Sequence, residues 1–296
     1  MSYWKILRVL VSDFCNYHCV FCHNEGQSKD SQQNKSMPYD HFEITIKSLK
    51  QSEFKEVQFS GGETFANPAT IKMIEMVNSS TNWEIGCATN GQLLSDGIAE
   101  RLGKTRVKLN INLPSLNDDI FKAKTGGGSL SKLKQKLTPL DAHKVDYAFN
   151  SVIQTGGLNE LFDLIDFCWE RGKRLKILPY IDIDEPAHPP FLNDLYNHLD
   201  SIATSSSVQP TNRKWKLSDR GNGICVIKIV DSPCYDLNIH ACKDYGEVRL
   251  LPDFSIQPCL INSTNRYQIE FGLQDTDQEN EIKSKFEKAW MNFSAC

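Results

Sequence analysis

The stretch Ser12-Asp-Phe-Cys-Asn-Tyr-His-Cys-Val-Phe-Cys-His-Asn24 places three cysteines, Cys15, Cys19 and Cys22, on one short segment, with Phe21 directly before the third. Thiolates spaced this closely on one loop can hold a single cubane iron–sulfur cluster, whose irons are bound by cysteine sulfur. Three sulfurs cover three irons, so the fourth iron has no local protein ligand. An iron without a protein ligand can chelate a small molecule, and the spacing therefore predicts a reactive cluster.

Two alternatives to the cluster remain open on these residues alone. His18 and His23 lie inside and beside the segment, so a zinc site is one alternative, although zinc would want a fourth Cys or His at tetrahedral spacing. A set of unrelated buried cysteines is the other.

Apolar runs and amphipathic stretches alternate through the first 180 residues. Parallel strands need crossover connections, which are normally helices, so this order predicts an α/β fold with a parallel sheet and helices outside it. We expect strands at 6–11, 55–60, 83–88, 106–112, 146–153 and 174–180, and helices near 39–52, 68–78, 95–103, 129–141 and 158–172.

The alternation stops near residue 182, where Asp184-Glu-Pro-Ala-His-Pro-Pro190 predicts a linker because consecutive prolines cannot continue a helix or a central strand. The sequence thus divides into residues 1–182 and 183–296. The second part is expected to contain a Ser/Thr/Asn-rich loop between its first helix and first strand. Its predicted elements are helices near 191–203 and 277–293 and strands near 213–218, 225–230, 247–251 and 255–258.

Polar residues follow the predicted strands at their carboxyl ends, where loops carry function. In Ser60-Gly61-Gly62-Glu63 the glycines let the backbone approach a ligand closely, and the Glu63 carboxylate can accept from an ammonium group. Thr89 and Asn90 end the third strand and Asn112 ends the fourth. Plain turns are the alternative for both the Gly-Gly-Glu and the Asn-Gly segments.

Together these motifs resemble the radical S-adenosylmethionine (radical SAM) superfamily. The resemblance implies a partial (β/α)6 barrel with its active site at the carboxyl ends of the strands. It also implies that the amino and carboxylate groups of S-adenosylmethionine bind the free iron of a [4Fe–4S] cluster. The cofactor-binding residues that it implies are Phe21, Gly61, Gly62, Glu63, Thr89, Asn90 and Asn112.

The resemblance implies an enzyme in which one electron from the cluster cleaves S-adenosylmethionine to a 5'-deoxyadenosyl radical, which abstracts hydrogen from a substrate. The expected outcome is cyclisation, rearrangement or oxidation of a small metabolite or natural-product precursor. A peptide substrate is the alternative, followed by a non-catalytic iron–sulfur or zinc protein. An external electron donor such as flavodoxin or ferredoxin is the expected partner.

Several stretches are similar to the GTP 3',8-cyclase family of molybdenum-cofactor synthesis, including Leu7-Arg8 and Val248-Arg249-Leu250. That similarity implies that Arg8, and with it Arg249, contacts substrate, whereas a surface ion pair is the alternative for Arg8. The chain departs from the family at Glu247, which replaces an arginine, and at Thr64-Phe-Ala-Asn67, which lacks an expected arginine pair. Because a triphosphate needs Arg or Lys donors, these losses argue against GTP as the substrate.

Cys234, Cys242 and Cys259 form a second constellation, in predicted loops and around a hairpin that brings the last two together. The region looks like the auxiliary-cluster extension (SPASM- or twitch-like) of related enzymes, which implies a second [4Fe–4S] cluster near the barrel mouth, followed by a final helix. Cys225, Cys296 and the substrate are the candidates for its fourth ligand. Free buried thiols are the alternative.

Composition narrows the classes of function. The net charge of -4 over 296 residues offers no broad basic surface, so we expect no duplex nucleic-acid partner. The amino terminus has no signal-peptide pattern and no apolar run approaches a membrane span, so a cytoplasmic location away from membranes is expected. In a reducing setting, ten cysteines favour metal binding or chemistry over disulfides.

Overall fold

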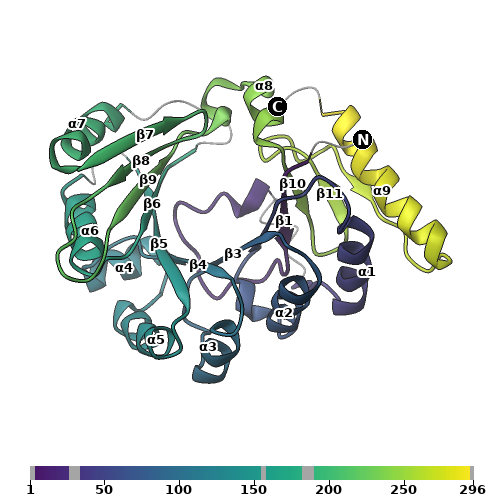
Figure 1. Cartoon of the computed structure of the whole chain (residues 1–296), viewed down its shortest axis with the longest axis horizontal. Coiled ribbons are helices and arrows are strands. Elements are labelled where there is room, and N and C mark those ends of the chain that lie inside the picture. The colour runs from purple at the N-terminus through teal and green to yellow at the C-terminus, as the bar shows by residue number, and fades with distance from the viewer. Residues whose placement is uncertain (1–3, 27–33, 155–157, 182–189, 294–296) are drawn as a thin grey trace.

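The structure is a computed structural model, which describes residues 4–26, 34–154, 158–181 and 190–293. Its strands belong to one continuous sheet that curves around a central space, with helices on the outside (Figure 1). The strands are β1 (Ile6–Leu10), β2 (Glu56–Ser60), β3 (Glu84–Thr89), β4 (Lys108–Asn112), β5 (Asp146–Ile153), β6 (Leu175–Pro179), β7 (Ser205–Gln209), β8 (Asn212–Lys216), β9 (Val226–Val230), β10 (Glu247–Leu250), β11 (Ser255–Gln257) and β12 (Tyr267–Gln268).

The order of strands in the sheet is β12-β11-β10-β1-β2-β3-β4-β5-β6-β9-β8-β7. All pairings from β10–β1 across to β6–β9 are parallel, and the outer hairpin strands at both edges are antiparallel. This arrangement confirms the predicted α/β partial barrel with a carboxy-terminal extension. Because the parallel strands end at the same edge, the loops that follow them meet at one mouth.

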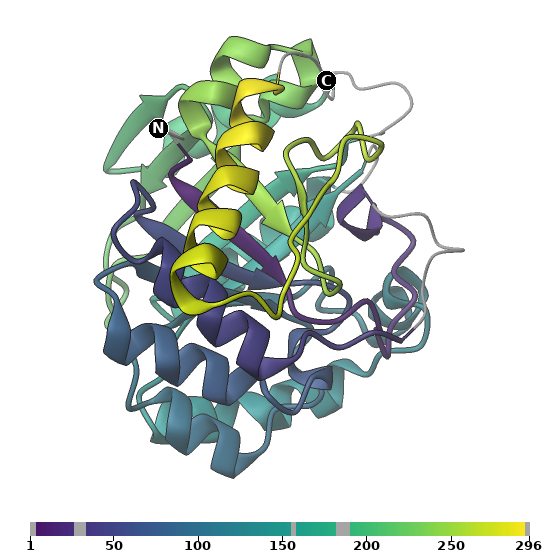
Figure 2. The same ribbon diagram turned by 90° about the vertical axis from the view of Figure 1, so that its right-hand side faces the viewer.

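The helices cover the outer face of the sheet. The last helix, α9, packs beside α1 and also contacts the edge strands β11 and β12 (Figure 2). The indole Nε1 of Trp4 donates to the Phe286 carbonyl of α9 at 3.0 Å. The helices are α1 (Tyr39–Leu49), α2 (Thr70–Ser80), α3 (Asp96–Leu102), α4 (Asp118–Thr125), α5 (Leu130–Ala142), α6 (Leu158–Glu170), α7 (Leu192–Ile202), α8 (Ile239–Tyr245) and α9 (Asp275–Met291), with 3-10 turns η1 (Asn24–Gly26), η3 (Thr64–Ala66) and η4 (Pro233–Asp236).

Alternation along the strands separates the core from the inner space of the barrel. In β1, Leu7 and Val9 are fully buried in the core, while Arg8 lines the inner cavity. In β2, Val57 and Phe59 are buried in the same way. Since successive side chains of a strand point to opposite faces, polar residues at every second position face the inside. This pattern is what lines the site with charged and amide groups.

The six strands predicted before residue 182 are all present, and those after it join the same sheet. β10 pairs with β1 and β9 pairs with β6, so the carboxy-terminal segment extends both edges. The predicted division at residue 182 and most of the predicted linker fall on residues 182–189, which lie outside the described residues.

Several elements differ from the prediction. β7 lies where a loop was expected, and α4 was not anticipated. Cys242 was expected in a loop but lies in α8, and Cys234 lies in η4, so that only Cys259 lies in a loop. Among the described residues, no helix has the length and apolar character needed to cross a bilayer.

Candidate active site

A cavity of about 400 Å³ opens inside the curve of the sheet, at the carboxyl ends of its strands. This size falls within the range of small-molecule sites in proteins. Every site residue expected from the sequence lines it, namely Arg8, Cys15, Cys19, Phe21, Cys22, Gly61, Gly62, Glu63, Thr89, Asn90, Asn112, Cys234, Cys242, Arg249 and Cys259. The structure therefore brings both cysteine sets and the strand-end residues to one place.

The cysteine loop runs from β1 to η1, and backbone amides within it point at its sulfurs. The Tyr17 N–H donates to the Cys15 Sγ at 3.4 Å, and the Asn24 N–H donates to the Cys22 Sγ at 3.3 Å. Such hydrogen bonds stabilise negative charge on sulfur and are one of the ways in which a protein tunes a cluster. The loop is thus built to carry thiolates.

The thiols of this loop are costly to ionise without a cation beside them. Burial and the neighbouring charges raise the pKa of Cys15 to about 11 and that of Cys19 to about 12, and Cys22 contributes to both shifts. A bound cationic centre would reverse this balance, because metals bind cysteine as the thiolate. The donor chemistry therefore fits an iron–sulfur cluster.

Among the described residues, no three His, Cys, Asp or Glu side chains converge as the ligands of a single metal ion do. A cubane spreads its ligating sulfurs over several irons and so does not need that convergence.

The carboxyl end of α4 packs directly against the cysteine loop. The His18 N–H donates to the Thr125 carbonyl at 3.0 Å, and a Cβ at Gly126 would lie 2.5 Å from the His18 carbonyl oxygen. A Cβ at Gly128 would lie 2.5 Å from the Tyr17 ring. The first and third glycines of the run at 126–128 are the sequence signal for this close packing, whereas a Cβ at Gly127 would meet nothing within 4 Å.

The Gly-Gly-Glu segment is bonded directly to the start of the cysteine loop. The Gly62 N–H donates to the Ser12 carbonyl at 2.8 Å, and the Glu63 N–H donates to the Phe14 carbonyl at 2.7 Å. A Cβ at Gly62 would lie 2.1 Å from the Phe14 carbonyl oxygen, so no other residue fits there without moving the loop. The glycines therefore hold the cysteine loop against the sheet, and they also leave the backbone accessible to a ligand.

The Glu63 side chain is hydrogen-bonded to the carboxyl end of β3. Its carboxylate accepts from the Phe65 N–H at 3.1 Å, from the Thr89 hydroxyl at 2.6 Å and from the Asn90 N–H at 2.7 Å. The sequence suggested an ammonium partner, but these donors occupy three of the roughly four lone-pair sites of a carboxylate. Asn90 in turn donates from Nδ2 to the Asn16 Oδ1 at 2.7 Å, so these hydrogen bonds connect Glu63 and the end of β3 with the cysteine loop.

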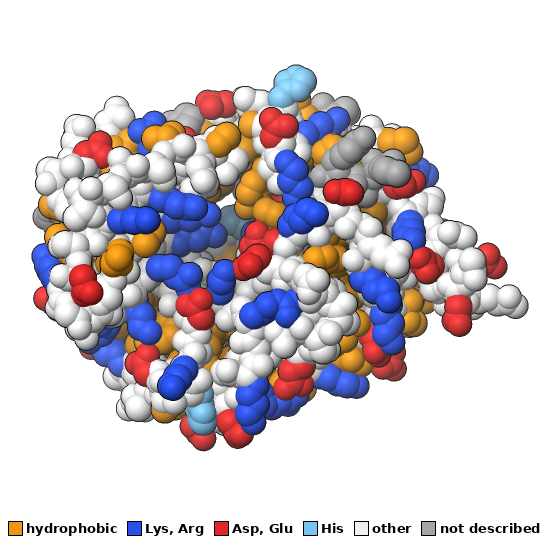
Figure 3. Space-filling model, in the orientation of Figure 1, with side chains coloured by type: hydrophobic (Ala, Val, Ile, Leu, Met, Phe, Trp, Pro, Cys, Tyr) orange, Lys and Arg blue, Asp and Glu red, His pale blue; other side chains and the backbone are white. Residues whose placement is uncertain are grey.

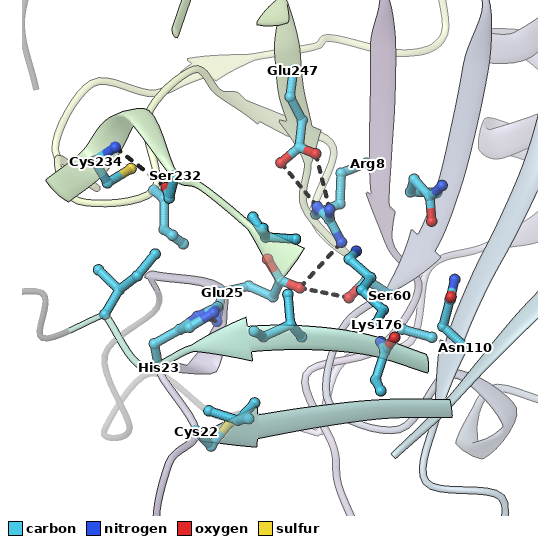
Figure 4. A pocket seen from close by; sticks show the side chains of 18 of the residues that line it. Arg8, Cys22, His23, Glu25, Ser60, Asn110, Lys176, Ser232, Cys234 and Glu247 are labelled. Carbon is cyan, nitrogen blue, oxygen red and sulfur yellow. Dashed lines mark hydrogen bonds and ion pairs between the residues drawn. The ribbon is translucent and has the colours of Figure 1, made fainter. Parts of the chain in front are cut away.

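Two arginines and two glutamates form an ion cluster on the wall of the cavity. Figure 4 shows three of its members, Arg8, Glu25 and Glu247. Arg8 donates from Nε and a terminal nitrogen to Glu247 at 3.0 and 2.9 Å, and its other terminal nitrogen lies 3.6 Å from Glu25. Arg249 lies 2.9 Å from Glu247 and 3.5 Å from Glu25. The Ser60 hydroxyl donates to Glu25 at 2.6 Å.

The two carboxylates of this cluster offset the charges of the two arginines. Burial alone would raise the pKa of Glu25, but the attraction of Arg8 and Arg249 lowers it to about 2. The pKa of Glu247 is lowered in the same way against its burial. Arg8 was expected either to contact substrate or to pair with a surface carboxylate; its partners are partly buried carboxylates that line the cavity.

The second cysteine set is held by three different elements. Cys234 lies in η4, where the Ser232 hydroxyl accepts from its N–H at 3.2 Å; Cys242 lies in α8, and Cys259 follows β11. The Asn262 N–H donates to the Cys259 Sγ at 3.3 Å, as in the first loop. Cys225 instead donates to the Lys173 carbonyl at 3.1 Å, at the amino end of β9, and Cys296 is outside the described residues.

A family model described as the radical SAM superfamily matches residues 9–165, more than half of the chain. The chain belongs to the radical SAM superfamily. The family, the enzyme class and the partial-barrel fold predicted from the sequence are therefore confirmed. Radical SAM proteins carry a [4Fe–4S] cluster and bind S-adenosylmethionine, and the donor set described above fits that cluster.

Curated relatives of this radical SAM enzyme include the probable GTP 3',8-cyclases of two archaea. The protein of Methanocaldococcus jannaschii is 27% identical over 276 residues, which cover 88% of this chain and 86% of the relative. That of Methanothermobacter thermautotrophicus is 25% identical over 284 residues, covering 92% and 89%.

Two solved radical SAM structures share the fold. Streptococcus suis SuiB bound to precursor peptide SuiA superposes with a TM-score of 0.71 at 14% identity, over 99% of this chain and 67% of SuiB. Native anSMEcpe with bound AdoMet superposes with a TM-score of 0.65 at 15% identity, over 97% and 83%. At these identities the likeness concerns the fold alone.

Several residues that line this radical SAM cavity were not predicted from the sequence. Glu25 lies in a polar stretch without a recognisable pattern, and Asn110, Asn150, Lys176 and Lys228 lie within strands. The sequence feature that could have identified the four strand residues is a polar residue between apolar residues of a strand, because such a residue faces the inside of a barrel.

Proposed function

We propose that this radical SAM enzyme abstracts hydrogen from a small molecule bound between two iron–sulfur clusters. Cys15, Cys19 and Cys22 hold the first cluster, which with S-adenosylmethionine supplies the 5'-deoxyadenosyl radical. Cys234, Cys242 and Cys259 hold the second. The observation that supports this proposal is that both cysteine sets line the same cavity. In this proposal residues 183–296 form the auxiliary-cluster domain.

The protein's own contribution is to position the cofactor. The bared backbone of Gly61 and Gly62 lies beside the cysteine loop, and we assign to it the amino group of S-adenosylmethionine. Thr89, Asn90 and Asn112 stand along the same mouth and are assigned to its ribose and carboxylate. Glu63 orients Thr89 and Asn90, and Phe21 closes the site beside Cys22.

The substrate that fits best is a small metabolite or natural-product precursor other than GTP. A cavity of about 400 Å³ suits a small molecule. The relatives named as GTP 3',8-cyclases raise GTP as a candidate, but Arg8 and Arg249 are already neutralised by Glu25 and Glu247. A triphosphate would therefore face no free arginine in this cluster. A peptide that enters by one side chain is the alternative.

Electrons have to reach the first cluster from outside. Cys22 is exposed, whereas Cys15 and Cys19 are half-buried, so the Cys22 edge is the most accessible part of this cysteine set. We propose that an external donor such as flavodoxin or ferredoxin docks at this edge.

Iron analysis of anaerobically reconstituted protein tests the two-cluster proposal. We expect about eight irons per chain in the wild type and about four in either the Cys15/Cys19/Cys22→Ala or the Cys234/Cys242/Cys259→Ala variant, because a cubane contains four irons. Cys225→Ala is the matched control and should retain both clusters. With dithionite and S-adenosylmethionine, 5'-deoxyadenosine should form in the wild type and not in the first triple variant.

Two results would count against the proposal. Wild-type protein that binds about four irons, unchanged by the second triple variant, would leave the carboxy-terminal cysteines without a cluster. Protein that holds both clusters but forms no 5'-deoxyadenosine with any reductant would remove the radical step.

A further inference from the structure

One row of polar residues crosses the inner wall of the barrel on the strands β4, β5, β6 and β9. Asn112 pairs in register with Asn150, Asn150 with Lys176, and Lys176 with Lys228. All four line the cavity. Residues in register on neighbouring strands point to the same face, so the two lysines stand side by side.

Within the described residues neither lysine is paired directly with a carboxylate, although Glu247 and Glu56 attract Lys176 and Glu56 attracts Lys228 from farther away. Within the described part of the chain, neither ammonium group makes a hydrogen bond or an ion pair. Burial and the neighbouring cations Arg8 and Lys228 lower the pKa of Lys176 to about 8, against the weaker attraction of Glu247 and Glu56. Burial is also the main cause of the lowered pKa of Lys228.

Adjacent desolvated ammonium groups repel each other, and this cost persists only where something compensates for it. The arginines of the same cavity differ, because each lies against two carboxylates. Figure 3 shows Lys and Arg side chains along one side of the central hollow and acidic side chains on the other. The positive charge without a directly paired carboxylate is therefore on the β6–β9 wall.

A neighbouring amide also lacks a partner. The Oδ1 of Asn150 is buried and accepts no hydrogen bond within the described part of the chain. A buried acceptor without a donor costs free energy, so a ligand that donates there is favoured. The lysines require an anion, and Asn150 requires a donor beside it.

We propose that Lys176 and Lys228 bind an oxyanion group of the substrate, a carboxylate or a phosphate monoester, and that Asn150 accepts a hydrogen bond from a hydroxyl or amine next to that group. This inference rests on the proposed function, since it takes the cavity as the substrate site. Two lysines partly offset by Glu56 suit one or two negative charges and not the four of a nucleoside triphosphate.

Anion binding to the reconstituted enzyme tests the proposal without turnover. The probes are inorganic phosphate and succinate, titrated calorimetrically at constant ionic strength against the wild type and the Lys176→Gln and Lys228→Gln variants. We expect each substitution to weaken binding about tenfold or more, since each removes a charge-assisted hydrogen bond to the anion. Lys134→Gln, an exposed change of equal charge on α5, is the matched control and should bind as the wild type does.

The two probes separate the sources of the anion. Tighter binding of phosphate supports a phosphate ester, tighter binding of succinate supports a carboxylate, and equal binding supports the oxyanion site without choosing between them. No binding of either probe to the wild type, or equal affinity in both lysine variants and Lys134→Gln, would overturn the proposal. Lys176→Arg keeps the charge and should retain binding, which distinguishes loss of charge from misfolding.

This inference and the proposed function fail in different ways. If the lysine variants lose anion binding while their iron content is unchanged, the anion site stands on its own. If the wild type binds the anion but holds only one cluster, the two-cluster proposal fails and the anion site remains.

Discussion

Glu63 illustrates how a single buried carboxylate organises the mouth of the barrel. It accepts hydrogen bonds from Phe65, Thr89 and Asn90, and burial raises its pKa. Glu63→Ala would leave these donors unsatisfied, at a cost of about 1–3 kcal/mol per buried group. We therefore expect the melting temperature to fall by several degrees and the affinity for S-adenosylmethionine to fall about tenfold.

Calorimetric melting and equilibrium binding of S-adenosylmethionine to the cluster-loaded enzyme measure these two effects. Glu53→Gln, an exposed change elsewhere, should alter neither. A Glu63→Ala protein that melts lower but binds S-adenosylmethionine as tightly as the wild type would limit Glu63 to a structural role.

The lowered pKa of Lys176 predicts that anion binding depends on pH. Its pKa is lowered to about 8 by burial and by Arg8 and Lys228, with Glu247 and Glu56 opposing. The ammonium form is therefore present below about pH 8 and is lost as the pH rises through that value. Since succinate remains fully ionised over this range, its affinity should fall between pH 7 and pH 9.

Titrations of succinate at a series of pH values check this expectation. Lys176→Arg provides the comparison, because a guanidinium stays charged throughout, so its affinity should fall less over the same range, only as far as Lys228 titrates. A fall of the same size in both proteins would assign the titration to another group.

At the scale of elements, the cysteine loop and the Gly-Gly-Glu segment form one unit. A Cβ at Gly62 would lie 2.1 Å from the Phe14 carbonyl oxygen, so Gly62→Ala has to push the loop away from β2. We expect the variant to fold but to lose most of the amino-terminal cluster, measured as about four irons per chain instead of eight. Gly97→Ala in α3, where a Cβ meets nothing within 4 Å, should keep both clusters and melt no lower.

Most of the barrel could be predicted because its strands carry the pattern of their environment. The strands that were found by sequence contain apolar residues that are buried against helices, such as Val57 and Phe59 of β2. β7 was missed because its sequence, Ser205–Gln209, is exposed along its whole length and carries no such pattern. α8 was missed for the same reason, since none of its residues is buried.

The candidate site was predictable where a local motif carries the chemistry. The cysteine loop and Ser60–Glu63 are short stretches with a recognisable spacing, and they line the cavity as expected. The partners of Arg8 could not be predicted, because Glu25 and Glu247 come from segments that only the folded sheet brings together. The same is true of Lys176 and Lys228, which meet because β9 pairs with β6.

At the scale of the whole molecule, both ends of the chain build the cavity. β10 pairs with β1, and β9 pairs with β6, so the late strands flank the early barrel on both sides. The ion cluster lies at the first of these junctions, where Arg249 is in register with Arg8. The late segment thus brings Glu247, which neutralises the arginine contributed by the early one.

This neutralisation predicts how the substrate preference can be changed. In a Glu25→Gln/Glu247→Gln double variant, Arg8 and Arg249 would lose their carboxylate partners and become free to bind phosphate groups. We expect GTP to bind the double variant about tenfold or more tightly than it binds the wild type, since hydrogen bonds between arginine and phosphate are charge-assisted. Equilibrium dialysis with reconstituted protein measures the two affinities.

A second double variant, Glu53→Gln/Glu170→Gln, removes the same charge from exposed positions outside the cavity and serves as the control. Equal gains in both double variants would indicate a general effect of net charge, which is screened by salt, and not release of the arginines. If the cavity variant binds GTP no better than the wild type while its iron content and melting temperature are unchanged, the two glutamates do not exclude the triphosphate. The preference would then have to come from the shape of the cavity, because its charge would have been shown to be insufficient.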